Sequence, residues 1–172
     1  MNSQQNQQVQ QIQHAQQIAQ SSHGEEESIQ EYIYTHIPIV QANKFTIQSH
    51  NHQIQVSGTL SDHVNHRNSA FGGSISTALT IAAWAAVRSL IPQHQRSTTV
   101  VVIQSERVAF TKPVVQDFIA ENTLITEEER KKLFASLDRH GKARITIRAS
   151  IRHQQDSEIL ATFSGDFVVV RR

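Results

Sequence analysis

The stretch that decides the fold is NHRNSAFGGSISTALTIAAWAAVRSL, residues 65–90. A polar loop leads into the pair Gly72-Gly73, and apolar residues then recur every three or four positions as far as Leu90. This spacing predicts a long helix with one apolar face, which Pro92 closes. The middle of the helix is thin, because alanines occupy positions 82, 83, 85 and 86. Other elements can therefore pack closely around it.

The segments on either side of this helix change to a period of two. Residues 45–60 alternate around a polar turn at residues 50–52, which predicts an antiparallel hairpin. Residues 98–110 and 117–124 predict two more strands. The last two strands alternate most regularly, with apolar positions at Ala143, Ile145, Ile147, Ala149 and Ile151, and then at Ile159, Ala161, Phe163, Gly165, Phe167 and Val169.

Two further helices complete the expected order. Residues 28–36 predict a short helix that Pro38 ends, and residues 61–71 are expected to form a polar loop. The pair Thr126 and Glu129 predicts a capping box at the start of another helix. The order therefore predicts an α+β fold in which an antiparallel sheet holds a central helix, and it argues against a parallel βαβ fold.

Composition limits the classes of protein. The chain has 172 residues, with 16 Lys and Arg against 15 Asp and Glu. A nearly neutral chain gives no reason to expect a nucleic acid or anionic lipid partner. The absence of cysteine excludes disulfides, thiolate nucleophiles and Cys-ligated metal. No stretch reaches the roughly 20 predominantly apolar residues of a membrane span.

One folded domain preceded by a tail is expected. Residues 1–27 form a Gln-dominated arm with too little apolar surface to offset the entropy of ordering it, so we expect it to be disordered. Residues 28–172 are expected to form one folded domain. The N-terminus lacks the cationic start and apolar stretch of a signal peptide, which favours a cytoplasmic protein.

The loop and helix at residues 65–74, followed by Thr77, Leu79, Ala82 and Trp84, resemble the signature of hot-dog-fold acyl thioesterases. They resemble in particular the thioesterase-like domain that follows an acetyltransferase in YiiD-type bacterial proteins. The strand IQSERVAFTKP, residues 103–113, resembles the second signature of that domain. The resemblance spans residues 28–170.

This resemblance implies a hot-dog fold, with an antiparallel sheet wrapped around a long central helix, and a homodimer or a dimer of dimers joined edge to edge. It implies a thioester of coenzyme A or acyl-carrier protein as substrate, and no cofactor. In such families the substrate carbonyl lies near the start of the long helix. One chain supplies the Asn and Gly-Gly region, and the partner chain supplies strand residues.

The chemistry of a helix start agrees with that placement. Its first backbone N–H groups are unpaired and carry partial positive charge, and Gly72-Gly73 lets a carbonyl approach without a Cβ in the way. The pair is therefore a candidate oxyanion site. Alternatively, the glycines only permit a tight turn into a closely packed helix. The resemblance assigns Asn65 to orienting the attacking water or the thioester oxygen.

The sequence departs from the family pattern at the general base. Phe71 stands where related enzymes have His, and Thr80 stands where the helix is expected to carry Asp or Glu. His66 is a candidate replacement, because imidazole titrates near neutral pH, although an exposed loop histidine explains it equally simply. Asp62 and a Glu106 reaching the cleft from a partner chain are alternatives. The predicted catalytic set is Asn65, His66, Gly72, Gly73 and Thr80, and the predicted substrate-binding set is Phe71, Ser74, Thr77, Gln104, Ser105 and Glu106.

Other sites and functions are weaker candidates. The histidines near residues 50–52 and 62–66 lack the spacing of a known helix-borne zinc motif, so no metal is expected. Lys112 is among the cations available for coenzyme A phosphates. Besides an acyl thioester hydrolase, Thr80 favours a non-catalytic acyl-CoA-binding or assembly module. A thioester dehydratase needs a paired His and carboxylate, for which the helix offers no carboxylate.

Overall fold

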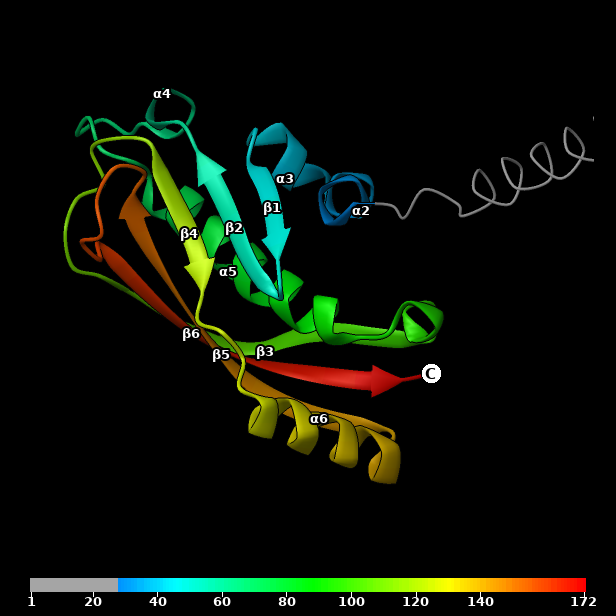
Figure 1. Cartoon of the computed structure of the whole chain (residues 1–172). Helices are drawn as coiled ribbons and strands as arrows, with labels where there is room; N and C mark the ends of the chain where they lie inside the picture. Colours follow the sequence, from blue (N-terminus) through cyan, green and yellow to red (C-terminus); the bar gives the residue numbers. More distant parts are fainter. Residues whose placement is uncertain (1–27) are drawn as a thin grey trace, which may run out of the picture.

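The computed structural model describes residues 28–172. The predicted arm, residues 1–27, lies outside the described residues. One antiparallel sheet of six strands holds the fold together, in the order β1-β2-β4-β5-β6-β3, and the long helix α5 lies across it (Figure 1). The predicted α+β class and the hot-dog architecture are therefore confirmed. The strands are β1 (Thr46–His50), β2 (Gln53–Gly58), β3 (Thr99–Phe110), β4 (Phe118–Asn122), β5 (Lys142–His153) and β6 (Ala161–Arg171).

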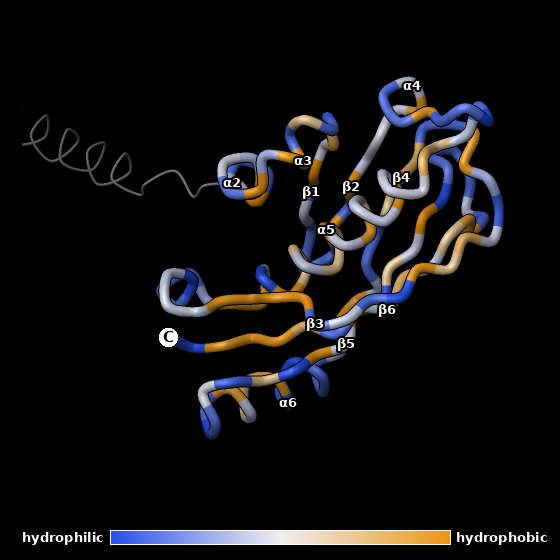
Figure 2. The backbone as a smooth tube through the Cα atoms, turned by 180° about the vertical axis from the view of Figure 1, so that it is seen from behind, coloured by the Kyte–Doolittle hydropathy of each residue, from blue (hydrophilic) through white to orange (hydrophobic). Residues whose placement is uncertain are grey.

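The core lies between α5 (Gly72–Leu90) and the sheet. The helix contacts β2, β3, β4, β5 and β6. The apolar face expected from the sequence is buried, at Ile75, Leu79, Ala82, Ala86 and Leu90. All four central alanines have 0% exposure, which is how the sheet approaches so closely. Near the C-terminus, the first half of β3 pairs with the last half of β6, and Figure 2 shows that both are strongly apolar. Valines dominate the paired positions.

Helix caps follow the sequence closely, with one addition. Helix α2 (Ile29–His36) begins at a capping box between Ser28 and Glu31, and α6 (Glu127–His140) begins at the predicted box between Thr126 and Glu129. The prediction that Pro38 only ends a helix was incomplete. Pro38 also starts a second short helix, α3 (Pro38–Ala42), because a proline ring suits the first helical position.

The segment predicted as a polar loop, residues 61–71, begins with a helix. Helix α4 (Leu60–His63) follows directly after β2, so Leu60 does not extend that strand as predicted. His63 is buried at 3% exposure, stacked on Phe45 with ring centroids 4.6 Å apart. An added Cβ at Gly58 would lie 2.6 Å from the Phe118 ring, so the glycine leaves room for this aromatic cluster.

The start of the last strand was predicted two residues too early. Strand β6 begins at Ala161, and Ile159 is 42% exposed. Leu160 is buried instead, because its N–H donates to the Ile151 carbonyl and its own carbonyl accepts from the N–H groups of Thr111 and Lys112. These contacts fix the backbone before the regular alternation begins.

Strand β3 forms an edge of the sheet and contains a bulge. The register with β6 runs from Thr99 to Ile103 and resumes at Ser105, so Gln104 is an extra residue. A bulge of this kind reverses which alternate side chains face the core. Val101 faces the buried side before the bulge, and the even-numbered residues face it afterwards. The bulge thereby decides which β3 side chains meet α5.

Candidate active site

The start of α5 carries backbone N–H groups that no acceptor uses. Phe71 is the N-cap, and its side chain makes no capping hydrogen bond. The first helical hydrogen bond is from the Ile75 N–H to the Phe71 carbonyl at 3.1 Å. Within residues 28–172 the N–H groups of Gly72, Gly73 and Ser74 have no acceptor, and no acidic residue lies in the first turn. This end of the helix is therefore suited to bind an oxygen that gains negative charge.

The loop before the helix is held by short backbone hydrogen bonds. The Ala70 N–H donates to the Val114 carbonyl and the Phe71 N–H to the His63 carbonyl, each at 2.7 Å. The Asn65 side chain accepts from the Arg67 N–H at 2.7 Å and donates to the Ser69 hydroxyl at 3.2 Å. Asn65 thus fixes the loop that leads to the helix.

The two glycines have different surroundings. A Cβ added at Gly73 would lie 2.3 Å from the Phe71 ring, so that ring covers the place of a side chain. A Cβ added at Gly72 would lie 3.6 Å from the Phe110 ring, an ordinary contact. Gly73 therefore lies directly under the Phe71 ring, whereas Gly72 has room in front of it.

A pocket opens beside Gly72. It has a volume of about 320 Å³ and is lined by the helix start and by the end of β3 with the segment after it, including Ile75, Phe110 and Lys112. Phe71 and Phe110 are 58% and 54% exposed at this end of the molecule. Lys112 forms an ion pair with Glu158. The pocket brings apolar surface next to the unpaired Gly72 amide.

Further along, α5 and β3 meet through one polar contact. The Thr80 hydroxyl donates to a Glu106 carboxylate oxygen at 2.9 Å and also lies 2.8 Å from the Ser76 carbonyl. The carboxylate that the helix sequence lacks is thus present at Thr80, supplied by the neighbouring strand. The Thr77 hydroxyl donates to the Gly73 carbonyl at 2.9 Å, so it is used within the helix.

The remaining predicted residues are not gathered at the helix start. Gln104 accepts from Arg144, and the Ser105 hydroxyl donates to Asp166, both on the exposed face of the sheet. His66 is exposed on the loop. Ser74 is half-buried in the first helical turn, and its hydroxyl has no hydrogen-bond partner within residues 28–172.

Asp62 is held by other partners. Lys44 and Thr59 donate to its carboxylate at 2.5 and 2.8 Å. These hydrogen bonds, that of Lys44 first, hold the pKa of Asp62 below its usual range. A carboxylate with a lowered pKa is a weak base, so Asp62 is poorly suited to activate water.

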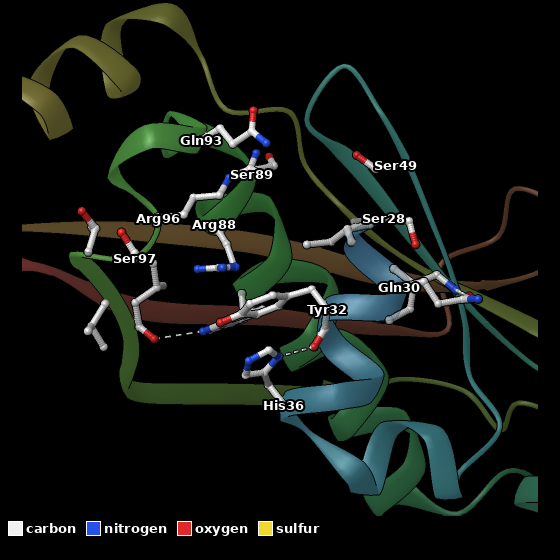
Figure 3. Close-up of a pocket in the computed structure, with 16 residues that line it drawn as sticks. Ser28, Gln30, Tyr32, His36, Ser49, Arg88, Ser89, Gln93, Arg96 and Ser97 are labelled. Carbon is white, nitrogen blue, oxygen red and sulfur yellow. Dashed lines mark hydrogen bonds between the residues drawn. The ribbon is translucent and has the colours of Figure 1, made fainter. Parts of the chain in front are cut away.

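A second, larger pocket lies at the opposite end of α5. It has a volume of about 960 Å³ between α2, β1, the end of α5 and the start of β3, and it contains none of the sequence-predicted site residues. Figure 3 shows Arg88 against Tyr32. The guanidinium carbon of Arg88 lies 3.7 Å from the centroid of the Tyr32 ring and 5.8 Å from that of the Trp84 ring. His36 stacks on Tyr32 with centroids 4.0 Å apart. These contacts join α2 to α5.

Sequence reasoning missed this cluster, and it did not place Phe110 in the pocket beside Gly72. The spacing of Trp84 and Arg88 by four residues indicates neighbours on one helix face, but nothing local places Tyr32 beside them.

Among the described residues, no group of three or more metal-binding side chains is arranged around a common point. Within residues 28–172, no helix is both long and apolar enough to cross a membrane.

Comparison with known proteins identifies the family of this chain. A family model described as "Putative thioesterase (yiiD_Cterm)" matches residues 26–171. The chain belongs to this family. The comparison with curated proteins finds no match.

Solved structures share the YiiD_C fold. A "putative thioesterase" from Shewanella oneidensis is 20% identical with a TM-score of 0.69, covering 83% of this chain and 94% of the other. A Pseudomonas aeruginosa protein named "Probable Thioesterase" is 15% identical with a TM-score of 0.73, covering 84% and 94%. A Chlorobaculum tepidum protein of unknown function is 23% identical with a TM-score of 0.74, covering 84% and 93%. At these identities the likeness concerns the fold.

Proposed function

We propose that this chain hydrolyses acyl thioesters carried by coenzyme A or by acyl-carrier protein. The observation that supports this most is the unpaired Gly72 N–H, which opens on an apolar-lined pocket at the start of α5. Thioester hydrolysis passes through a tetrahedral oxyanion, and backbone N–H groups at a helix start stabilise such a charge. Membership of a thioesterase family agrees with the same chemistry.

The reaction follows from this arrangement. The thioester oxygen accepts a hydrogen bond from the Gly72 N–H, and water adds to the carbonyl carbon. The C–S bond then breaks, the sulfur takes up a proton and leaves as a thiol, and the acyl group leaves as the acid. In this proposal Asn65 acts by holding the loop, and the exposed rings of Phe71 and Phe110 contact the acyl chain.

We propose a homodimer joined along β3. This strand is at the sheet edge, so one row of its backbone groups has no neighbouring strand. Val102 and Ile103 are 46% and 38% exposed there, and Phe110 is 54% exposed. An exposed apolar edge suits pairing with a second copy.

The cytoplasmic location stays a prediction.

The proposal is tested with purified protein and acyl-CoAs of increasing chain length, with thiol release as the readout. We expect turnover that depends on chain length, since the acyl group contacts an apolar pocket. Binding of acyl-CoA without turnover at any length would reject the hydrolase and favour the non-catalytic binding module. Acyl-carrier protein thioesters, assayed in parallel, distinguish the two carriers.

A further inference from the structure

Glu106 is directed toward α5 by the bulge in β3. Glu106 lies opposite Gly165 of β6. Two positions to either side of Gly165, on the same face of the strand, Phe163 and Phe167 are buried on the side that α5 covers. Ser105 and Arg107 lie opposite exposed residues of β6. If Gln104 were paired in regular alternation instead of bulged, Ser105 would face the helix and Glu106 would face away from it. The bulge in β3 thus directs the Glu106 carboxylate toward α5.

The contact between Glu106 and Thr80 leaves the carboxylate available to water. Glu106 is exposed, and its hydrogen bond from Thr80, at 2.9 Å, fixes one carboxylate oxygen. Within residues 28–172, Glu106 forms no ion pair. An adjacent cation would favour the charged form and weaken the carboxylate as a base. Asp62 and Glu158 are paired with Lys44 and Lys112 in that way.

We infer that Glu106 is the general base of the proposed hydrolase and that Thr80 is its positioning residue. The inference rests on the proposed function. As the water oxygen bonds to the thioester carbon, a Glu106 oxygen takes one water proton. When the C–S bond breaks, the same carboxyl returns that proton to the sulfur. The products are a thiol and a carboxylic acid, and Glu106 ends as it began.

The site needs two copies of the chain. Thr80 lies eight residues after Gly72, which at 1.5 Å per residue is about 12 Å along the helix. One carbonyl therefore does not reach both the Gly72 N–H and Glu106 of the same protomer. A copy that pairs with β3 through a two-fold axis perpendicular to this strand runs in the opposite direction, which brings its helix start toward Glu106. The division of the site between two chains, which the family resemblance implies, then gives each active site the Glu106 base of one protomer and the Gly72 donor of the partner.

The first test replaces the carboxylate by its isosteric amide. Glu106→Gln retains a hydrogen-bond acceptor for Thr80, and we expect kcat to fall by about 100- to 10,000-fold, with KM little changed. Arg107→Gln is the matched control, because this neighbouring side chain faces away from α5, and we expect wild-type kcat. Thr80→Val is expected to lower kcat, and Thr80→Ser to restore it, since serine keeps the hydroxyl.

The second test mixes two inactive variants. Glu106→Gln protein is unfolded and refolded together with Gly72→Pro protein, which lacks the Gly72 N–H. If base and donor come from different protomers, half of the dimers regain one intact site, and activity recovers to about a quarter of the wild-type value. No recovery, with mixed dimers present, would overturn the shared site.

The outcomes separate this inference from the proposed function. Wild-type protein that releases no thiol from any thioester refutes the hydrolase itself. Wild-type activity that Glu106→Gln retains refutes only the base. Loss of activity in His66→Gln, with Glu106→Gln active, would assign the base to the loop histidine instead. We expect thiol release by the wild type, its loss in Glu106→Gln, and its recovery in the mixed dimers.

Discussion

Replacing Gly72 by proline is a substitution that removes one backbone N–H and leaves the helix in place. Phe71 has φ −65° and ψ 133°, the extended conformation that the residue before a proline prefers. Gly72 is the first residue of α5, where proline is favoured. The Phe110 ring lies 3.6 Å from the Cβ position, so a side chain fits. The fold should therefore accept Gly72→Pro.

Activity and stability should change in opposite directions. Losing one oxyanion donor lowers kcat by about 100- to 1,000-fold, which is about 2.7 to 4 kcal/mol of transition-state stabilisation. The free energy of unfolding should rise by about 0.4 to 1 kcal/mol, because proline restricts the unfolded chain. A variant that is more stable and less active cannot owe its lost activity to unfolding.

The assay compares Gly72→Pro with Gly72→Ala. Alanine adds the Cβ that proline also has but keeps the N–H, so it controls for a substituent on the Cα atom. Thiol release gives kcat and KM, and urea unfolding gives stability. A proline variant that turns over as fast as the alanine variant would refute the role of the Gly72 N–H. Unfolding of the proline variant under native conditions would refute the geometry of the helix start.

Three other perturbations test neighbouring features. Burial holds the pKa of His63 below its ordinary 6.5, so the unfolded chain binds the proton more tightly than the folded protein does. The stability that is present above pH 6.5 should therefore be lost as pH falls. Urea midpoints measured from pH 8 to 5 should show this loss of stability in the wild type and a smaller loss in His63→Leu. Gly73→Ala should displace the Phe71 ring, which is 58% exposed, so the loss of about 1 kcal/mol of ring burial should cancel the gain of about 1 kcal/mol of helix propensity and leave stability nearly unchanged. In a Phe71→Ala background the same substitution should stabilise the fold by about 1 kcal/mol, and equal effects in both backgrounds would show that the ring is not docked. Ile103→Lys should convert the dimer to a folded monomer in light scattering, and an unchanged mass would locate the interface elsewhere.

The regular elements could be predicted from the sequence because their signals are local. The apolar face of α5, the capping box at Thr126 and the alternation of β5 each depend on residues a few positions apart. The sequence also shows that Thr80 stands where the family pattern has an acidic residue, because this difference lies within one helix. Such patterns report on periodicity and hydrogen bonding within a segment, so one sequence is enough to find them.

The features missed depend on contacts between distant segments. The bulge at Gln104 arises from pairing with β6, and nothing in residues 99–110 indicates which position is inserted. The sequence therefore named Glu106 without showing that it meets Thr80 of its own chain. His63 is buried because Phe45 and Phe118 meet around it, although it stands in a polar stretch. In each case the tertiary neighbour decides the role.

A structure of the protein with a non-hydrolysable thioester analogue, in which a methylene replaces the sulfur, tests the central claim most directly. We expect the carbonyl oxygen within about 3 Å of the Gly72 nitrogen. We also expect a water molecule between the carbonyl carbon and the Glu106 carboxylate of the second protomer. An analogue bound instead beside Tyr32 and Arg88, with nothing at the start of α5, would contradict the proposed site.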